Sequence, residues 1–465
     1  MECGFAALIL AAGEGKRMHS ATAKVLHKVG GKPMIQRVCD NARIAGAGTQ
    51  VVVVGHLAQE VIASLGEGLA WTIQEERLGT GHAVMTGLRK LDSMECNAAN
   101  MLVLCGDTPL LTPQLIQDIM MQHLKQGNAV TVLTTDMENP AGYGRVIRGE
   151  GGNIARIVEH RDATDLECQI REINTGIYCF QTKALRESLS ALKADNSQKE
   201  YYLTDTLGIL LSMGHLAGCV KAPDPDRVMG VNDRIQLAEA NRTAYLEKSR
   251  ELMLSGVTVL DPATTWIDED VTVGVDTLIY PGTFLQGNVN IGINCIIGPH
   301  AVIRDAVIGD RVEICYSTVS SSIVEEGAHI GPFAYLRPGS SIGRNVKVGD
   351  FVEIKNSRLG DGTKVSHLTY IGDSDIGKDV NFGCGVVTVN YDGTRKHRTR
   401  VGDEAFIGCN ANLVAPVEVG NHSYIAAGST ITSDVPEDSF AIARAYQTTK
   451  VGYAREKGYY KSKKE

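Results

Sequence analysis

Near the N-terminus, glycines and cationic side chains follow an apolar segment. Residues 10–18 read Leu-Ala-Ala-Gly-Glu-Gly-Lys-Arg-Met, and Lys24 follows. Glycine lets the backbone pass close to phosphate oxygens, which the N–H groups of a turn can bind. Lys16, Arg17 and Lys24 would offset the phosphate charge. The pattern fits a phosphate-binding loop, but a simple strand–helix turn is an equally open alternative, since the loop is neither a Walker A nor a good dinucleotide motif.

A carboxylate follows a second apolar segment. Residues 101–104 are apolar and lead into Cys105-Gly106-Asp107. At the carboxyl end of a buried strand, Asp107 is well placed to hold Mg²⁺ beside a phosphate. The alternative is that Asp107 only caps the next helix, whose early proline would suit that position. The residues alone leave both interpretations open.

The last third of the chain carries a set of polar side chains at positions where the repeat allows them to point outward. They are Arg337, Lys355, His367, Tyr370, Asn381, Asn390 and Tyr391. A histidine titrates near neutral pH, so His367 is a candidate for general acid–base chemistry. Exposed histidines are common, however, so a purely architectural role for this region is the alternative.

The elements that position this second set repeat every six residues. The apolar residues of the repeat are Val401, Ile407, Leu413, Val419, Ile425 and Ile431, and earlier Ile330, Leu336, Ile342, Val348 and Ile354. A period of six fits neither a helix nor a lone strand. It indicates a solenoid in which every sixth residue points into one core. The pattern begins near Val257 and stops near Pro436, and residues 390–400 interrupt it, as an insertion on a working face would.

The first 230 residues follow an alternating α/β pattern. Apolar segments that predict buried strands lie at 5–10, 51–54, 101–104 and 129–133. Amphipathic segments between them predict crossover helices, as in a largely parallel sheet with helices on both faces. Residues 234–254 contain no Gly or Pro and predict one long helix that Gly256 ends.

Composition excludes several classes of protein. The chain has 465 residues, with 46 Lys and Arg against 54 Asp and Glu, for a net charge of −8. This mild acidity argues against a protein that binds nucleic acid. The 11 cysteines have neither zinc nor Cys-x-x-Cys spacing, which fits reduced thiols. We find neither a secretory signal nor the ~18 apolar residues of a membrane span, so we expect a cytoplasmic protein.

The motifs of the first half resemble those of the sugar-1-phosphate nucleotidylyltransferases. Beyond residues 10–18 and 24–26, they are Gln74, Leu78-Gly79-Thr80-Gly81-His82, Gly106-Asp107, Gly142-Tyr143-Gly144-Arg145, Val158-Glu159-His160, Glu172-Ile173-Asn174-Thr175-Gly176 and Tyr201-Tyr202-Leu203-Thr204-Asp205. With the solenoid included, nearly the whole chain is similar to the bacterial family of bifunctional N-acetylglucosamine-1-phosphate uridylyltransferases / glucosamine-1-phosphate N-acetyltransferases. In the second half, Gly362 to Asp373 and Asn390-Tyr391-Asp392-Gly393 are close to the acetyltransferase motifs of that family.

The resemblance implies a role for each matching residue of the first half. Residues that would bind the uridine nucleotide are Leu10, Ala11, Ala12, Gly13, Gln74, Gly79 and Thr80. Those for the N-acetylated sugar are Gly144, Glu159 and Asn174, and Asp107 and Asn232 would carry Mg²⁺. The sugar phosphate would attack the α-phosphate of UTP, with Mg²⁺, Lys24 and Arg17 neutralising charge.

The same resemblance assigns the second site. Arg337 and Lys355 would bind glucosamine phosphate, Tyr370 and Asn381 would position the sugar, and His367 would be the general base. The coenzyme would contact Asn390, Tyr391, Ala427 and Arg444. Two positions that also belong to the coenzyme site depart from the commonest pattern: Cys384 stands where many relatives have Ala, and Cys409 where many have Ser. A thiol is the weaker hydrogen-bond partner.

The family implies a Rossmann-like α/β domain, a long helix and a left-handed parallel β-helix of hexapeptide repeats. We set the boundaries at 1–231 for the uridylyltransferase domain, 232–252 for the linker helix and 253–465 for the acetyltransferase domain with its tail. The expected protein is a homotrimer of cell-wall precursor synthesis that uses UTP, acetyl-CoA, glucosamine-1-phosphate and its N-acetylated product. The alternatives are a nucleotidylyltransferase whose hexapeptide domain is structural or regulatory, and a non-enzymatic scaffold. The Arg337, Lys355 and His367 set argues against the first, and Lys24 with Asp107 against the second.

Overall fold

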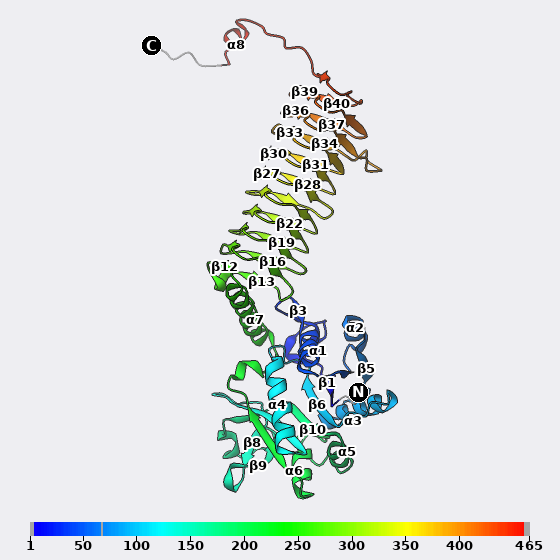
Figure 1. Ribbon diagram of the computed structural model, residues 1–465, viewed down its shortest axis with the longest axis vertical. Coiled ribbons are helices and arrows are strands. Elements are labelled where there is room, and N and C mark those ends of the chain that lie inside the picture. Colours follow the sequence, from blue (N-terminus) through cyan, green and yellow to red (C-terminus); the bar gives the residue numbers. More distant parts are fainter. Residues whose placement is uncertain (1–3, 67, 460–465) are drawn as a thin grey trace, which may run out of the picture. The chain divides into compact units, whose positions relative to one another are not determined.

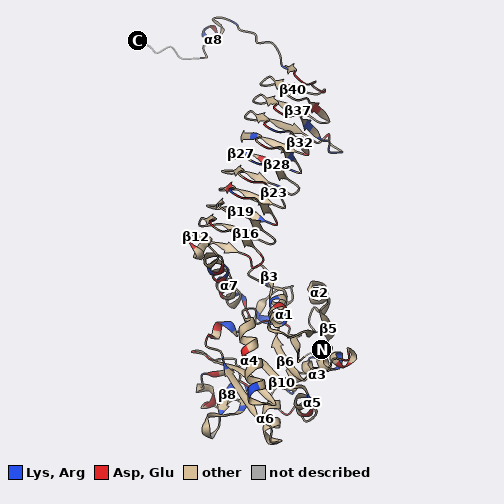
Figure 2. Ribbon diagram, in the orientation of Figure 1, with Lys and Arg blue, Asp and Glu red and all other residues tan. Residues whose placement is uncertain are grey.

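The computed structural model describes residues 4–66 and 68–459 and divides the chain into two compact units, Met1–Leu246 and Glu247–Glu465 (Figure 1). In each unit, Lys and Arg are interspersed with Asp and Glu (Figure 2). Among the described residues, no helix combines the length and the apolar character that crossing a bilayer would require.

The first unit is built around a nine-stranded mixed sheet. Its strands are β1 (Phe5–Ala11), β4 (Thr49–Val54), β5 (Ala70–Ile73), β6 (Asn100–Cys105), β7 (Val130–Asp136), β8 (Arg145–Arg148), β9 (Ile154–Val158), β10 (Glu172–Gln181) and β11 (Ala217–Lys221). The main order is β11-β7-β10-β6-β1-β4-β5, and β8 and β9 extend from β10. A separate pair consists of β2 (Lys28–Val29) and β3 (Lys32–Pro33).

Helices cover both faces of this sheet. They are α1 (Met34–Ala45), α2 (Ala58–Ser64), α3 (Thr80–Ser93), α4 (Pro113–Gln126), α5 (Thr182–Ser190) and α6 (Asp205–Ser212). Alternate side chains of β1 point to opposite sides, as a strand requires. Ala7 and Ile9 pack in the core with α1 and α4, whereas Ala6 and Leu8 pack with α3, α5 and α6. The predicted layers are therefore confirmed.

The predicted strands are present, but the sheet is less parallel than we expected. β1 pairs in parallel with β4 and β6, whereas β10 lies antiparallel between β6 and β7. The difference arises because a fully buried apolar strand has the same composition in either direction. The register of β10 against β7 shifts between Asn174 and Tyr178, and this irregularity lies where the predicted sugar-binding residue Asn174 stands.

A buried histidine in α4 is expected to make this unit sensitive to acid. His123 is 1% exposed, its Nδ1 lies 3.0 Å from Thr131 Oγ1, and burial lowers its pKa to about 4. Between pH 6.5 and 4 an unfolded chain would bind a proton that the folded unit excludes, so stability falls as the pH is lowered. At pH 5 we expect this residue alone to reduce the free energy of unfolding by about 2 kcal/mol relative to pH 7.

The measurement uses the two tryptophans, of which Trp71 lies in the first unit. In a Trp266→Phe background, Trp71 fluorescence during urea unfolding at pH 7 and pH 5 reports on that unit. His123→Gln should lose less stability on acidification than the parent, and His56→Gln, at an exposed position, should lose as much. An equal loss in all three proteins would show that His123 does not cause the acid sensitivity.

The second unit is a left-handed parallel β-helix of hexapeptide repeats, formed by three sheets with 11, 10 and 9 strands. The first sheet has β12 (Thr258–Val259), β15 (Leu278–Ile279), β18 (Ile296–Ile297), β21 (Glu313–Ile314), β24 (His329–Ile330), β27 (Lys347–Asp350), β30 (Lys364–His367), β33 (Asn381–Phe382), β36 (Phe406–Ile407), β39 (Tyr424–Ile425) and β41 (Phe440–Ala441). The second has β13 (Trp266–Ile267), β16 (Phe284–Gln286), β19 (Val302–Arg304), β22 (Thr318–Ser320), β25 (Tyr335–Leu336), β28 (Glu353–Lys355), β31 (Tyr370–Gly372), β34 (Val387–Val389), β37 (Asn412–Val414) and β40 (Thr430–Ile431). The third has β14 (Thr272–Val273), β17 (Asn290–Ile291), β20 (Val307–Ile308), β23 (Ile323–Val324), β26 (Ser341–Ile342), β29 (Arg358–Leu359), β32 (Ser374–Ile376), β35 (Thr399–Val401) and β38 (Val417–Val419).

Each predicted hexad supplies one strand of this β-helix. Ile407, Leu413 and Val419 lie in the first, second and third sheets, and all three are buried in one continuous core. One coil therefore takes three hexads. Equivalent side chains then stack directly on those of the next coil, as Val401 does on Val419.

The structure also locates the interruptions. Between β34 and β35 the chain leaves the coil, and an isolated bridge joins Tyr391 to Lys396. The repeats extend slightly beyond Pro436, near which we expected them to stop, since β41 (Phe440–Ala441) still pairs with β39. α7 spans Arg234–Leu254, as the sequence predicts, and Gly256 follows with a φ of 98°. The last helix is α8 (Tyr453–Glu456).

Candidate functional sites

The glycine-rich loop lies at the carboxyl end of the central strand β1. After Ala12 the chain turns through Gly15, which has a left-handed φ of 62°. A Cβ at Gly15 would lie 2.7 Å from Lys24 Cβ, so glycine allows Lys24 to pack against the loop. Gly106 of the neighbouring strand end donates to the Leu10 carbonyl at 2.9 Å. The ends of β1 and β6 are thereby joined.

The predicted nucleotide-binding residues Gln74, Gly79 and Thr80 gather at the start of α3. Gln74 Nε2 donates to the Gly79 carbonyl at 3.1 Å, and Gln74 is 4% exposed. Gly79 has a φ of 101°, and a Cβ there would lie 2.7 Å from the Tyr201 carbonyl oxygen. The Leu203 amide donates to Thr80 Oγ1 at 3.0 Å. These contacts bring the segment around Tyr201 against the loop.

Gly144, Glu159 and Asn174, predicted to bind the sugar, also converge. The Asn174 amide donates to the Gly144 carbonyl at 2.9 Å. A Cβ at Gly144 would stand 3.6 Å from both the Asn174 Cβ and the Glu159 carboxylate, so glycine keeps this space open. Thr204 Oγ1 donates to Glu159 Oε1 at 3.2 Å, and burial raises the pKa of Glu159.

Lys24, Asp107 and Asn232 form one cluster of charged and polar groups. Lys24 Nζ is ion-paired with Asp107 and donates to Asn232 Oδ1 at 3.2 Å. The Val231 amide donates to the Asp107 carbonyl at 2.8 Å, which ties the segment of Asn232 to the end of β6. A Cβ at Gly230 would lie 3.3 Å from Asp107 Oδ1, so glycine leaves room beside the carboxylate.

The capping interpretation of Asp107 is wrong. Helix α4 begins at Pro113, and its N-cap is Thr112, whose Oγ1 accepts a hydrogen bond from the Leu115 amide. The Asp107 carboxylate therefore has no role at that helix end. It faces Lys24 instead.

The Asp107 and Asn232 oxygens fit a hard divalent cation. The donor set is small: among the described residues, no group of three or more His, Cys, Asp or Glu is arranged around a metal position. A cation held by these two oxygens would therefore take its remaining ligands from substrate phosphate and water.

The side chains of Cys105 and Tyr143 lie near this cluster. Burial raises the pKa of Cys105 to about 12, and the nearby Asp107 carboxylate adds to the effect, so its thiol stays protonated. The pKa of Tyr143 is also raised, first by burial and then by Asp107, while Arg17 opposes the shift. Arg17 is exposed.

In the second unit, the predicted phosphate-binding cations lie on the second sheet, where Arg337 follows β25 and Lys355 ends β28. Arg337 Nη1 donates to Glu353 Oε1 at 2.9 Å. The adjacent ammonium of Lys396 lowers the pKa of Lys355, and Arg337 contributes to the same effect. These three cations face two carboxylates, Glu353 and Asp373, and the remaining positive charge favours a bound anion. The sequence analysis did not identify Lys396.

Tyr370, one coil from Lys355, also meets Asn390 of the following coil. Asn390 Nδ2 donates to Tyr370 Oη at 3.4 Å and to Asp373 Oδ2 at 2.5 Å. A Cβ at Gly372 would lie 2.3 Å from Tyr370 Oη, so glycine leaves room for the phenol at this position. Partial burial acts to raise the pKa of Asp373. Hydrogen bonds from its neighbours and the Lys355 charge outweigh it, and the pKa is lowered.

His367 ends strand β30 and is half-exposed. Its Nδ1 lies 2.5 Å from Asp350 Oδ1, one coil below. The sequence analysis did not identify Asp350. Thr369 Oγ1 donates to the carbonyls of both His367 and Gly383, at 2.7 and 3.4 Å, and so ties the histidine to the next coil.

The predicted coenzyme-binding residues Cys384, Cys409 and Ala427 stack along this same edge. The Asn410 amide donates to the Cys384 carbonyl and the Gly428 amide to the Cys409 carbonyl, each at 2.8 Å. Arg444 packs beside Gly428, where a Cβ would lie 3.7 Å from Arg444 Cδ. Tyr391 lies outside this stack, in the segment that interrupts the repeat. Its Oη donates a hydrogen bond to the Gly393 carbonyl at 2.5 Å. Asn381 lies on β33, in register with Lys364.

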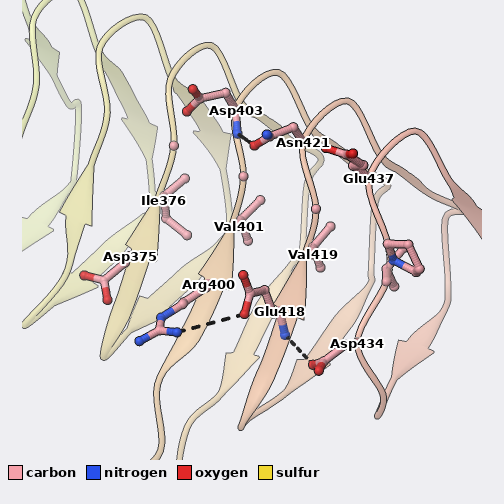
Figure 3. A pocket seen from close by; sticks show the side chains of 15 residues that line it. Asp375, Ile376, Arg400, Val401, Asp403, Glu418, Val419, Asn421, Asp434 and Glu437 are labelled. Carbon is pink, nitrogen blue, oxygen red and sulfur yellow. Dashed lines mark hydrogen bonds and ion pairs between the residues drawn. The ribbon is translucent and has the colours of Figure 1, made fainter.

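A groove of about 660 Å³ lies elsewhere on the β-helix, over β32, β35 and β38 (Figure 3). Its lining includes none of the predicted site residues. Asp403 and Asn421 are joined through the Asp403 amide at 2.9 Å, and Asp434 accepts from the Glu418 amide at 2.8 Å. These side chains serve the turns between coils, and we assign the groove to the architecture.

Both halves of the chain match known families. Residues 7–205 match the family of the MobA-like NTP transferase domain, and residues 321–356 and 398–433 match the bacterial transferase hexapeptide (six repeats) family. A protein of Acetivibrio thermocellus named Bifunctional protein GlmU is 50% identical over 465 residues, which is 100% of both chains. Proteins of the same name from Brevibacillus brevis and a Geobacillus species are 50% and 49% identical, over 96% of this chain and 96% and 97% of their own.

Proposed function

We propose a two-step function from the premise that this chain belongs to the family of bifunctional GlmU proteins. It acetylates glucosamine-1-phosphate with acetyl-CoA, and it then transfers UMP from UTP to N-acetylglucosamine-1-phosphate and releases pyrophosphate. The observation that carries this function is that two separate polar constellations occur in one chain, around Lys24 and Asp107 and around His367 and Lys355. A structural or regulatory solenoid would not need the second. We set the functional domains at 1–231 and 253–465, joined by the helix of 232–252.

In uridylyl transfer, the sugar phosphate oxygen attacks the α-phosphorus of UTP, and pyrophosphate leaves. Two anions must meet, so the protein has to neutralise charge. Lys24 and Arg17 supply fixed positive charge, while Gly144, Glu159 and Asn174 orient the sugar. We assign Mg²⁺ to Asp107 and Asn232, where it supplies charge neutralisation for the phosphates.

In acetyl transfer, the 2-amino nitrogen of the sugar attacks the thioester carbonyl carbon. The C–N bond forms, the C–S bond breaks, and the electron pair leaves on the coenzyme sulfur. His367 Nε2 accepts the amine proton and then returns it to the sulfur or to water. Arg337, Lys355 and Lys396 hold the sugar phosphate, and Tyr370 orients the sugar.

One incubation tests the whole proposal. The protein is mixed with glucosamine-1-phosphate, acetyl-CoA, UTP and Mg²⁺, each is omitted in turn, and products are identified by mass. Without UTP we expect N-acetylglucosamine-1-phosphate alone. Without acetyl-CoA we expect neither N-acetylglucosamine-1-phosphate nor UDP-N-acetylglucosamine. If the omission of acetyl-CoA left nucleotide-sugar formation from glucosamine-1-phosphate intact, the order of the two steps would be wrong. If only exogenous N-acetylglucosamine-1-phosphate were converted, the chain would have one activity.

The edge of the β-helix that carries His367 also supports assembly into a homotrimer. Tyr316, Phe333, Phe351 and Leu368 stand on successive coils of that edge, and Phe333, Phe351 and Leu368 are 54%, 59% and 58% exposed. All four have left-handed φ angles of 48–59°, which are unfavourable for bulky side chains. Adjacent rings of the three aromatic residues lie 5.5–5.6 Å apart. An exposed apolar row of this kind favours burial against a second copy.

Subunit mixing tests this assembly. When inactive His367→Ala and Arg444→Ala chains are co-expressed with different tags and purified through both, we expect acetyl transfer to return. Purification through both tags leaves only trimers that contain both kinds of chain, so about one third of the sites would be intact if neighbouring chains supply the two residues. Phe351→Ser should weaken the assembly in light scattering. A fully active monomer would refute the trimer.

Cytoplasmic localisation also belongs to this proposal. The substrates UTP and acetyl-CoA are cytoplasmic metabolites, and the ten described cysteines are all free. UDP-N-acetylglucosamine made there would serve the synthesis of cell-wall precursors and, through it, cell shape.

A further inference from the structure

In the first sheet of the β-helix, two strands are longer than the rest. β27 (Lys347–Asp350) and β30 (Lys364–His367) have four residues each, whereas the other strands of that sheet have two. The additional length adds one pair to the parallel ladder, Asp350 opposite His367. The ladder is therefore extended at the coil that presents the predicted base (Figure 1).

A glycine fixes this pairing. A Cβ at Gly349 would lie 2.0 Å from the Ser366 carbonyl oxygen, a distance at which no side chain fits. Only glycine therefore lets the two strands approach this closely, one residue before the pair. The Leu368 amide then donates to the Asp350 carbonyl at 3.0 Å, so the pair is enclosed by backbone interactions on both sides.

The side chains of the pair are in direct contact, with His367 Nδ1 at 2.5 Å from Asp350 Oδ1. The hydrogen bond from His367 lowers the pKa of Asp350, so its carboxylate is ionised at neutral pH and must accept. Nδ1 is then the protonated nitrogen of a neutral imidazole, and Nε2 carries the lone pair. Lys347, on the same strand as Asp350, is the other charged group that acts on this carboxylate.

We propose that Asp350 is the positioning residue for acetyl transfer, and that it holds His367 with Nε2 free to accept the proton of the sugar amine. The inference rests on the acetyl-transfer activity proposed above. When Nε2 takes the proton, the imidazolium faces an ionised carboxylate, which stabilises it. Asp350 would act through its contact with His367.

The β-helix contains a matched control pair. His329 on β24 and Glu313 on β21 belong to the same sheet, with His329 Nδ1 3.1 Å from Glu313 Oε2. This pair has the same chemistry one coil apart, but none of the predicted site residues belongs to it. Glu313→Gln therefore reports the effect of losing such a carboxylate on folding alone.

The experiment compares Asp350→Asn with Glu313→Gln in the full chain. We expect Asp350→Asn to lower kcat for acetyl transfer at least about tenfold, with the KM for glucosamine-1-phosphate unchanged. The acid limb of the kcat–pH profile should move to lower pH, because the imidazolium loses its counter-charge. Lys347, Lys364 and Tyr370 are present in both proteins, so the difference reports the carboxylate. Glu313→Gln should behave as wild type, and Asp350→Glu should recover part of the rate.

A second readout does not depend on activity. In ¹⁵N-histidine NMR at pH 8, assigned by difference with His367→Gln, His367 should be protonated at Nδ1 in wild type and should lose this preference in Asp350→Asn. An unaltered pH profile and tautomer in Asp350→Asn would refute the proposal. If wild type formed no N-acetylglucosamine-1-phosphate, the proposed function would fail instead. Unimpaired uridylyl transfer by Asp350→Asn would show that the chain is folded.

Discussion

His367→Ala is expected to lower kcat for acetyl transfer by about 10²–10⁴, the usual contribution of a general base, and to leave uridylyl transfer intact. The histidine is half-exposed at the end of β30, and its side chain forms a hydrogen bond with Asp350. Its removal therefore leaves no buried cavity and no unpaired buried group. The second unit should stay folded, so the loss is chemical.

The measurement is a pair of assays on one preparation, with acetyl-CoA consumption for one site and pyrophosphate release from UTP for the other. His329→Ala is the matched control, because it removes a histidine that also pairs with a carboxylate on the same sheet. It should retain both activities. If His367→Ala lost both activities while keeping the circular dichroism of wild type, the two sites would not be independent.

The hexads were predictable because each repeat of six residues forms one strand of the β-helix. Ile407 and Leu413 lie six residues apart, and each occupies one sheet of the β-helix. The strands β1 and β6 were predictable for a related reason, since a fully buried strand must be apolar throughout. The direction of β10 was not, because nothing in an apolar segment encodes its orientation.

The parts of the second site that the sequence analysis missed follow from coil geometry. Asp350 lies 17 residues before His367, which is one coil. A search for charged residues one coil away would have found it. Lys396 could not be found in this way, because it lies in the segment that interrupts the repeat, where sequence distance no longer gives spatial distance. The bridge between Tyr391 and Lys396 that holds this segment is visible only in three dimensions.

At the first site, the sequence left two roles open for Asp107, and the contacts in the structure exclude one of them. As a helix cap, Asp107 would be expected to contribute stability and little else. The cap of α4 is Thr112, and the carboxylate pairs with Lys24 beside Asn232. An anion retained here, in a space that Gly230 keeps open, is suited to binding a cation.

Asp107→Asn should therefore lower uridylyl transfer by about 10²–10³ or more, the effect of removing one preorganised electrostatic group, and should spare acetylation. The amide has the shape of the carboxylate but lacks its charge, so Lys24 would lose its ion-pair partner and the proposed cation would lose a charged ligand. Rates measured across a Mg²⁺ titration, together with Mn²⁺ binding followed by electron paramagnetic resonance, separate a weakened metal site from a general loss of activity. Asp118→Asn makes the same change on the exposed face of α4 and should leave both readouts as in wild type. If Asp107→Asn had a normal rate and a normal Mg²⁺ dependence, Asp107 would have no part in the reaction, and its role would be limited to the ion pair with Lys24.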